Sequence, residues 1–587
     1  MTWSLLRLLA LGAALSPTLQ ENAPPPADLI LVGARVYTLE ESQPWASTVV
    51  VTGDRITAVL QGGRQAAEPF RGPRTRIVDL SGRLVLPGFI DSHIHFDQAG
   101  ALINDANLLT VADDEGLRRE MRRLAALLEE GEWITGGLWG AYEQWALGAA
   151  GAQGERRPRW EPTRFLIDEI VPRHPCLLSS FDGELFLANS AALAAAGLTG
   201  APLPGMKTDA AHRIAGLVAK DSPALERLRA SVRPKSHARL LQENRAALKR
   251  LAESGIVEVH DIVKPEQTVR FVELQERGEL TCRVWLRPDL SRAEELRSQG
   301  LRPGLHPKTQ KPDAWLRYGA LKGYVDGIMG THGALFFEPY SDQPGNFGHY
   351  RPHTSDDPEL KVPNLAKLDR LLRIAAEAGF TANVHAIGDR GVALMLDAYE
   401  RLARDLGRDL EGYRVIHAQV VRSQDLPRFR QLNTIAEVNP YHVADDMRWM
   451  EERIGHERCK GAYAFRSLID HGATLCFGSD WPGTSAAEYH VHPKYLIHAA
   501  VNRTTLKGAP PGGWFPEQRI SVAEALQAYT INGARAALEA KTRGSIKAGK
   551  LADLSVLDRN LLEIDPRDIL DIQVDMTIVG GRIVFER

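Results

Sequence analysis

The period of hydrophobic and polar positions changes twice along the chain and divides it into three regions. Residues 28–86 hold short runs in which apolar and polar positions alternate, and the same alternation returns over residues 546–587. A period of two is typical of half-buried strands, and the Gly-Asp and Gly-Gly pairs between the runs are typical of turns. The two ends together predict one small β-sandwich domain, built from residues 28–86 plus 546–587.

The long middle region, residues 87–545, alternates strand-like and helix-like segments. Stretches such as 364–378 and 391–406 carry apolar residues at spacings of three and four, which is typical of amphipathic helices. Eight such units predict an α/β fold, a distorted (β/α)₈ barrel of the TIM type. A doubly wound dinucleotide fold is disfavoured because no Gly-x-Gly-x-x-Gly follows a strand. The predicted strands are 84–94, 256–262, 282–288, 318–326, 380–386, 413–419, 433–440 and 474–481.

About 160 residues separate the first two predicted barrel strands, far more than a βα loop needs. We therefore predict a separately folded insertion over roughly residues 106–235. The βα loops of a barrel rise from its C-terminal face, where active sites lie. The insertion is expected to stand over the mouth of the site and to influence which substrates enter.

The composition of the chain excludes several classes of protein and leaves the predicted fold unchanged. The chain has 71 Lys and Arg against 74 Asp and Glu, for a net charge of -3, so it lacks the basic excess of a nucleic-acid-binding protein. Its four cysteines form no Cys-x-x-Cys pair, which argues against a thiolate metal site. No segment is long and apolar enough to span a membrane. The expected partner is a small-molecule substrate.

The first twenty residues differ from the rest. Arg7 leads into the apolar run 8–15, which is too short for a bilayer but typical of the core of a signal peptide. Residues 21–27 contain Pro24-Pro-Pro26 and are interpreted as a linker. We expect residues 1–20 to direct export to the periplasm or the exterior, with a cytoplasmic location as the alternative if this leader is not functional.

Side chains that bind metals stand at the ends of several predicted strands. His93 and His95 are two residues apart, so a strand places both imidazoles on one face. A lone His in an apolar strand is usually a hydrogen-bonded core residue, but several such groups on one barrel face predict a metal site. Lys322 stands in an apolar strand that would rarely bury an ammonium, and such a lysine can react with CO₂ to form an anionic carbamate. The candidates are His93, His95, Lys322, His385, His417 and Asp480.

With these motifs the chain resembles the amidohydrolase superfamily, and within it the amidohydrolase-3 group of YtcJ-like and N-substituted formamide deformylase-like proteins. The resemblance covers nearly everything after the leader and is specific because so many motifs occur together. They are Leu86-Pro-Gly-Phe-Ile-Asp-Ser-His-Ile-His95, Lys322 with Asp326-Gly327, residues 338–342, Val384-His-Ala-Ile-Gly-Asp389, His417-Ala-Gln419, residues 463–468, Phe477-Gly-Ser-Asp-Trp-Pro482, residues 513–518 and residues 549–554.

The resemblance implies how the ligands are used. His93 and His95 would hold the more buried Zn²⁺ or similar ion, together with Asp480. Lys322, as a carbamate, would bridge to a second ion held by His385 and His417. The same residues also suit a single ion, with Lys322 left as a plain ammonium. The family further suggests a homodimer, by analogy alone.

The implied activity is hydrolysis of a non-peptide or peptide-like C–N bond of the amide type, by an amidohydrolase that acts on carbon–nitrogen bonds other than peptide bonds. The ion would generate a hydroxide that attacks the carbonyl carbon, and Asp480 would pass the proton to the leaving nitrogen. Two alternatives stay open: a deaminase or cyclic amidase with a single metal, and a metal-binding protein without turnover.

Three segments depart from the usual family pattern, and all lie where a substrate pocket is expected. Asp182-Gly-Glu184 replaces a common Asp-Gly-His, Ile416 replaces a common acidic residue ahead of His417, and residues 486–493 replace a Pro- and Gly-rich run. Substrate contacts are therefore hard to transfer from relatives. The candidate substrate-binding residues are Asp182, Glu184, His260, His332, Tyr441 and His442.

Overall fold

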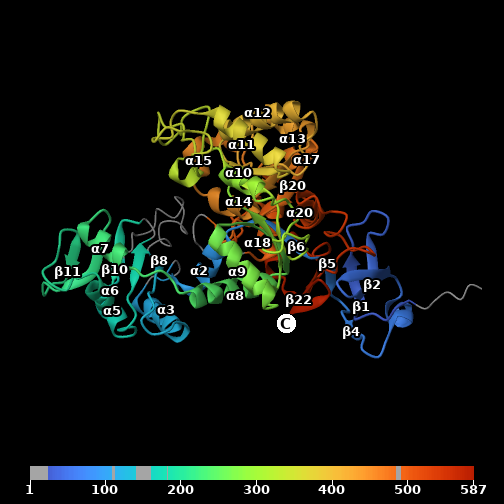
Figure 1. Cartoon of the computed structure of the whole chain (residues 1–587), viewed down its shortest axis with the longest axis horizontal. Coiled ribbons are helices and arrows are strands. Elements are labelled where there is room, and N and C mark those ends of the chain that lie inside the picture. The colour runs from blue at the N-terminus through green and yellow to red at the C-terminus, as the bar shows by residue number, and fades with distance from the viewer. Residues whose placement is uncertain (1–23, 109–110, 112, 140–159, 181–182, 484–490) are drawn as a thin grey trace, which may run out of the picture.

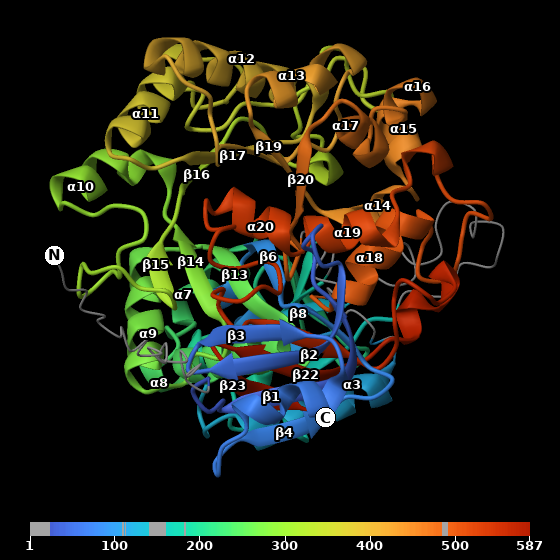
Figure 2. The ribbon, with the colours of Figure 1, turned by 90° about the vertical axis from the view of Figure 1, so that its right-hand side faces the viewer.

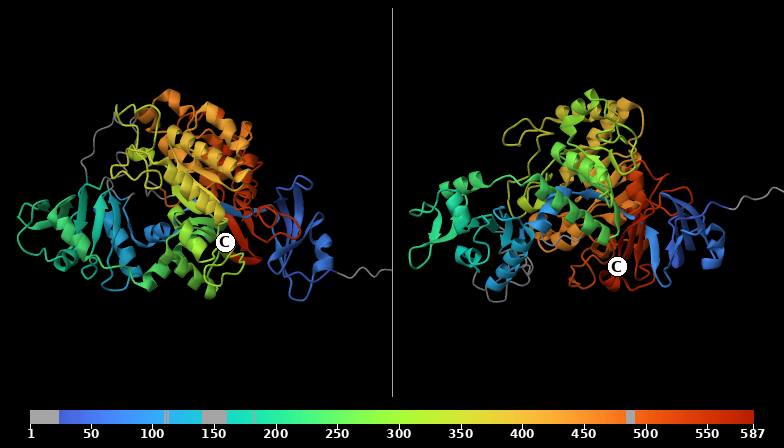
Figure 3. Two further views of the ribbon diagram at one scale, coloured as in Figure 1. Left: turned by 45° about the horizontal axis from the view of Figure 1, so that its top comes forward. Right: turned by 60° about the horizontal axis from the view of Figure 1, so that its bottom comes forward.

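The computed structural model describes residues 24–108, 111, 113–139, 160–180, 183–483 and 491–587. The predicted leader, residues 1–20, and the candidate Asp182 lie outside them. A sheet made from the two chain ends, a central barrel and the insertion follow one another along the longest axis of the molecule (Figures 1 and 3). In the part of the chain that the structure describes, no helix has both the length and the apolar character needed to cross a membrane.

Strands from both chain ends pair in one eight-stranded sheet of order β23-β22-β21-β5-β1-β2-β3, with β4 on β1. The join is made by antiparallel pairing of β5 with β21, and Figure 2 shows the strands of the two ends side by side. Side chains from both ends, such as Val36, Val49 and Val556, share one buried apolar cluster, which holds this sheet together. The strands are β1 (Leu29–Tyr37), β2 (Trp45–Thr52), β3 (Arg55–Leu60), β4 (Arg76–Asp79), β5 (Leu84–Pro87), β21 (Leu554–Leu557), β22 (Val574–Val579) and β23 (Arg582–Glu586).

The central region is the predicted distorted (β/α)₈ barrel. Its strands form two parallel sheets, of order β15-β14-β13-β6 and β16-β17-β18-β19-β20. Isolated parallel bridges join these sheets on both sides, Asp289 with Lys322 and Ile94 with Trp481. The strands are β6 (Phe89–Ile94), β13 (Ile256–Ile262), β14 (Arg283–Arg287), β15 (Leu316–Tyr318), β16 (Leu321–Tyr324), β17 (Ala382–Ala386), β18 (Arg414–His417), β19 (Ile435–Val438) and β20 (Thr474–Phe477).

Two of the predicted strands are each two strands in the structure. The segment 84–94 divides at Gly88, where the chain leaves the terminal sheet and enters the barrel. A Cβ atom at Gly88 would lie 2.2 Å from the side chain of Val257, so only glycine fits this crossing. The segment 318–326 divides because β15 pairs with β14 whereas β16 pairs with β17.

Helices follow the barrel strands and cover them. In α11 (Leu365–Glu377), Leu368, Leu372 and Ala375 are buried at spacings of four and three, and the Asn364 side chain caps the helix by accepting from the Lys367 amide. The principal other helices of this region are α8 (His237–Glu253), α9 (Pro265–Glu276), α10 (Ala293–Ser298), α12 (Asp389–Leu406), α13 (Leu426–Gln431), α14 (Pro440–Asp446), α17 (Phe465–Asp470), α18 (Pro493–Asn502), α19 (Val522–Ala528) and α20 (Ile531–Ala536).

The chain between β6 and α8 builds its own sheet, of order β11-β12-β10-β9-β8-β7, with its own apolar clusters. It lies on the side of the barrel opposite the terminal sheet (Figures 1 and 3). Helix α2 (Phe96–Asn104), which starts directly after His95, leads from the barrel to this insertion. Its elements are β7 (Ala106–Asn107), α3 (Asp114–Leu127), β8 (Gly136–Trp139), α5 (Arg164–Asp168), β9 (Leu177–Ser180), β10 (Leu185–Ala188), α6 (Ser190–Ala195), β11 (Met206–Thr208), β12 (Ile214–Ala219) and α7 (Pro223–Ser231).

Candidate metal centre

Three buried side chains meet at the carboxyl ends of the barrel strands. His93 comes from β6, His417 from the last position of β18, and Asp480 from the loop after β20. One possible ligand atom of each lies within 4.8 Å of the other two. Nε2 of His93 is 3.3 Å from Oδ1 of Asp480. Two imidazoles and a carboxylate at this spacing are the kind of ligand set that Zn²⁺ prefers.

The backbone around these residues is arranged for close approach. Gly478 precedes Asp480 and touches β6, where a Cβ atom would lie only 2.4 Å from Cβ of His93. His417 has φ 72 and Asp480 has φ 58, in the left-handed region that L residues rarely adopt. Such a conformation costs about 1–3 kcal/mol per residue and recurs at functional sites. Two of the three side chains are therefore presented by strained backbone.

Each imidazole is held through one ring nitrogen. Nδ1 of His93 lies 2.7 Å from Oε1 of Glu437, and Nδ1 of His417 lies 2.7 Å from Oδ1 of Asn439. Nε2 of His93 is buried and has no hydrogen-bond partner among the described residues. A buried ring nitrogen without a partner, whose opposite nitrogen is fixed by a carboxylate, fits the coordination of a divalent ion.

Asp480 is surrounded by histidines. Its Oδ1 is 3.1 Å from Nε2 of His95, and its Oδ2 is 3.7 Å from Nε2 of His442. Burial opposes ionisation of Asp480, yet the neighbouring His93 and His95 hold its pKa well below the ordinary carboxyl value. Asp480 is therefore a carboxylate at neutral pH.

Lys322 and His385 border this group. Lys322 on β16 is 1% exposed and forms no ion pair with any described carboxylate. Burial, aided by Arg287, lowers the pKa of Lys322 to about 7. The ring of His385 lies 4.5 Å from that of His417, centroid to centroid, but its Nε2 faces the carbonyl oxygen of Gly327 at 3.3 Å.

The predicted substrate-binding residues are scattered. His442 and Tyr441 lie on α14, where His442 faces Asp480 and the Tyr441 ring lies 6.3 Å from that of Tyr495. His332 contacts Asp342 and Arg453 and is largely buried.

Two of these predictions need correction. His260 is fully buried inside the barrel, with Nδ1 2.9 Å from Arg414 and Nε2 3.1 Å from Glu258, so neither ring nitrogen is left for a substrate. Glu184 stands in the insertion, where its 59% exposed side chain forms an ion pair with Lys220.

Three supporting residues escaped the sequence prediction. Asp91 accepts hydrogen bonds from the backbone nitrogens of His93 and Ser479 and from the Tyr529 hydroxyl, and so ties β6 to the loop that carries Asp480. The others are Glu437 and Asn439, which hold His93 and His417. Glu437 is the register partner of Ile416 across β18 and β19, the position at which the family pattern commonly has an acidic residue.

Comparisons with known proteins agree with this arrangement. A sequence model of the amidohydrolase family matches residues 76–585. Protein LONG AFTER FAR-RED 3 of Arabidopsis thaliana is 32% identical, over 97% of this chain and 94% of its own length. N-substituted formamide deformylase of Arthrobacter pascens is 27% identical, over 95% of this chain and 98% of its own.

A solved structure extends the likeness to the fold. The crystal structure of an uncharacterized metal-dependent hydrolase from Pyrococcus horikoshii OT3 matches with a TM-score of 0.69 and 25% identity, over 92% of this chain and 99% of that one. The resemblance predicted from the motifs is thereby confirmed. This chain belongs to the amidohydrolase family.

Proposed function

We propose that this metal-dependent hydrolase cleaves an amide-type C–N bond, other than a peptide bond, in a small molecule. The observation that carries the proposal is the buried group of His93, His417 and Asp480, in which Nε2 of His93 lies 3.3 Å from Oδ1 of Asp480 and has no hydrogen-bond partner among the described residues. The relative named N-substituted formamide deformylase supports the choice of an amide-type bond.

The chain supplies the groups that such a reaction needs. A divalent ion at this site would lower the pKa of a coordinated water from about 15.7 towards about 7 and polarise the substrate carbonyl. Asp480, a carboxylate within reach of this position, accepts the proton of the attacking water. It then delivers that proton to the leaving nitrogen as the C–N bond breaks. His442, whose Nε2 lies 3.7 Å from Oδ2 of Asp480, is the substrate contact that we propose beside the carboxylate.

The proposal includes a second ion, bridged by Lys322 as a carbamate and held by His385. Two observations on Lys322 favour the carbamate: it is buried without a carboxylate partner among the described residues, and its pKa of about 7 leaves part of the amine neutral. The neutral amine attacks CO₂ and releases one proton. The resulting anion would remove the cost of an unpaired buried cation.

One observation favours the alternative, a single-ion enzyme such as a deaminase or cyclic amidase. His417, which the two-ion arrangement assigns to the second ion, lies in one group with His93 and Asp480, the ligands of the first ion. His385, the other predicted ligand of a second ion, directs Nε2 at Gly327. The number of bound ions per chain distinguishes the two-ion hypothesis from the single-ion hypothesis.

The test is a metal analysis followed by a substrate screen. Purified protein, loaded with Zn²⁺ in bicarbonate buffer, is analysed for bound ions and for a carboxylated lysine by mass spectrometry. It is then assayed on N-substituted formamides, N-acyl amino acids and dipeptides, and on aminopurines as deaminase substrates. Chelator-sensitive hydrolysis of an N-substituted formamide or an N-acyl amino acid supports the proposal, whereas hydrolysis of dipeptides alone contradicts its restriction to non-peptide bonds. Turnover of aminopurines alone supports the alternative, and a metal-loaded protein that turns over no C–N substrate overturns both.

A further inference from the structure

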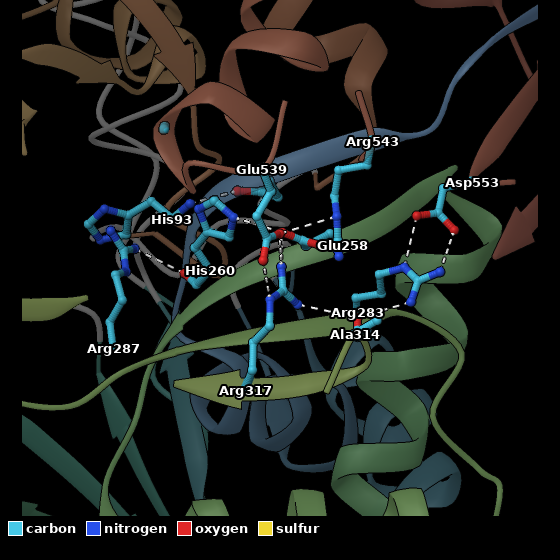
Figure 4. A network of polar contacts seen from close by, with 12 residues as sticks. His93, Glu258, His260, Arg283, Arg287, Ala314, Arg317, Glu539, Arg543 and Asp553 are labelled. Atoms are coloured by element: carbon cyan, nitrogen blue, oxygen red, sulfur yellow. Dashed lines mark hydrogen bonds and ion pairs between the residues drawn. The ribbon is translucent and has the colours of Figure 1, made fainter. Parts of the chain in front are cut away.

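A chain of largely buried polar contacts runs from His93 of the candidate metal centre between side chains of several barrel strands, and Figure 4 shows much of it. It starts at His93 and passes through Glu437, Arg287 and Arg414 to His260. It continues through Glu258 to Arg317, Arg543 and Glu539. Barrel interiors are ordinarily filled by branched apolar side chains, so a polar interior of this kind needs a reason.

We propose that Glu437, clamped by Arg287 and Arg414, is a positioning residue that fixes the tautomer and the ring orientation of His93, so that Nε2 is presented to the metal ion. The inference rests on the proposed function, since it concerns the same ion. Glu437 stands on β19, and its side chain is fully buried.

Hydrogen-bond geometry assigns the proton between His93 and Glu437. Nη1 of Arg287 donates to both carboxylate oxygens, at 3.0 and 3.1 Å, and Nη1 of Arg414 donates to Oε2 at 2.8 Å. With guanidinium donors on both oxygens, the carboxylate acts as an acceptor only. The hydrogen in the 2.7 Å contact must therefore sit on Nδ1 of His93. In the neutral imidazole this leaves the lone pair on Nε2, the ring nitrogen that has no hydrogen-bond partner among the described residues.

The clamp leaves Glu437 little freedom, because both arginines are anchored a second time. Nη2 of Arg287 donates to the backbone oxygen of His260 at 3.0 Å, and Nη2 of Arg414 donates to that of Ala536 at 2.7 Å. Both arginine side chains are fully buried. The carboxylate that orients His93 is thus held by groups from β14, β18 and the end of α20, and cannot turn away without leaving a buried charge unpaired.

Glu258 provides a matched control within the same network. It is also fully buried and also paired with two arginines, Arg317 and Arg543. Its third partner, however, is Nε2 of His260, which is not a candidate ligand. Removing the charge of Glu258 also takes a buried carboxylate from two arginines, but this residue makes no direct contact with the His93 ring.

The experiment compares Glu437→Gln with Glu258→Gln. The Zn²⁺ dissociation constant is measured by competition with a chromophoric chelator, and the visible spectrum of the Co²⁺-loaded protein is recorded. The amide of a glutamine at 437 can donate to Nδ1 and so shift the proton of His93 to Nε2. We expect Zn²⁺ affinity to fall roughly 10–100-fold in Glu437→Gln, with an altered Co²⁺ spectrum. Glu258→Gln should keep the wild-type spectrum and stay within about threefold of the wild-type affinity.

A second variant protects the test against misfolding. Glu437→Asp keeps a negative charge between the two arginines but withdraws the carboxylate from Nδ1 by one methylene. We expect it to fold and to lose affinity in the same direction. Wild-type affinity in both Glu437 variants, or an equal loss in Glu258→Gln, overturns the inference and leaves the proposed function standing. A wild-type protein that binds no ion overturns both.

Discussion

Gly478, directly after β20, packs tightly against His93 of β6, and its replacement by alanine is a sharp test of the site's geometry. The added Cβ would lie 2.4 Å from Cβ and 2.7 Å from the backbone nitrogen of His93. Carbon atoms in contact are ordinarily about 3.5–4.0 Å apart, so the two segments must separate by roughly 1 Å. Overpacking of this kind costs about 1–3 kcal/mol. A displacement of about 1 Å between reacting groups costs on the order of 100-fold in rate.

The control is Gly200→Ala in the insertion, where an added Cβ meets nothing within 4 Å. Both variants stiffen the unfolded chain equally, a stabilisation of about 0.4–1 kcal/mol, so their difference isolates the collision. Thermal unfolding, bound Zn²⁺ and turnover of the best substrate from the screen are measured for both. We expect Gly478→Ala to lose stability and roughly 100-fold in turnover, while Gly200→Ala matches the wild type. If the two variants behave alike, the close approach of Gly478 to His93 does not shape the site.

Three other changes have defined outcomes. Asp480→Asn keeps the size of the side chain but cannot take a proton, so turnover should fall about 10²–10⁴-fold while bound metal changes less; near-normal turnover at full metal content would refute its role. Asp553→Asn leaves the fully buried Arg283 without its carboxylate and should lower the free energy of unfolding by about 3–5 kcal/mol. The control, Glu563→Gln, breaks the exposed pair with Arg35 and should change that free energy little. Burial raises the pKa of Asp446 to about 7 from an ordinary 3.8, so between these values the unfolded chain releases a proton that the folded protein keeps. As pH rises from about 4 to 7, the unfolding free energy of the wild type should therefore fall by roughly 4 kcal/mol relative to that of Asp446→Asn. Chemical denaturation measures both, and the prediction fails if the two proteins show the same dependence of unfolding free energy on pH.

The strand-end residues could be read from the sequence because their signal is local. His93 and His95 differ by one strand period, and Asp480 follows an apolar run that ends in Gly-Ser. The eight βα units carried the barrel prediction in the same way. At Gly88, β5 continues into β6 without a polar break, so periodicity could not show that the chain passes from one sheet to another. The change of sheet depends on the pairing partners, which are β21 for β5 and β13 for β6.

The interior network could not be read from the sequence, because it depends on register between strands that are far apart in the chain. Glu437 meets Arg287 and His93 only because β19, β14 and β6 bring them to one level of the barrel. The same limitation explains the misplacement of His260, which stands on a barrel strand as a ligand would. Its neighbours in sequence gave no sign that Arg414 and Glu258 occupy both of its ring nitrogens.

The central claim is that one spot between His93, His417 and Asp480 holds a catalytic divalent ion. The most direct measurement is an anomalous diffraction map of the Zn²⁺-loaded crystal, recorded on both sides of the zinc absorption edge. We predict a peak about 2.0–2.2 Å from Nε2 of His93, from a ring nitrogen of His417 and from a carboxylate oxygen of Asp480. A map in which zinc is absent from this group, or lies elsewhere in a protein that hydrolyses its substrate, would contradict the claim.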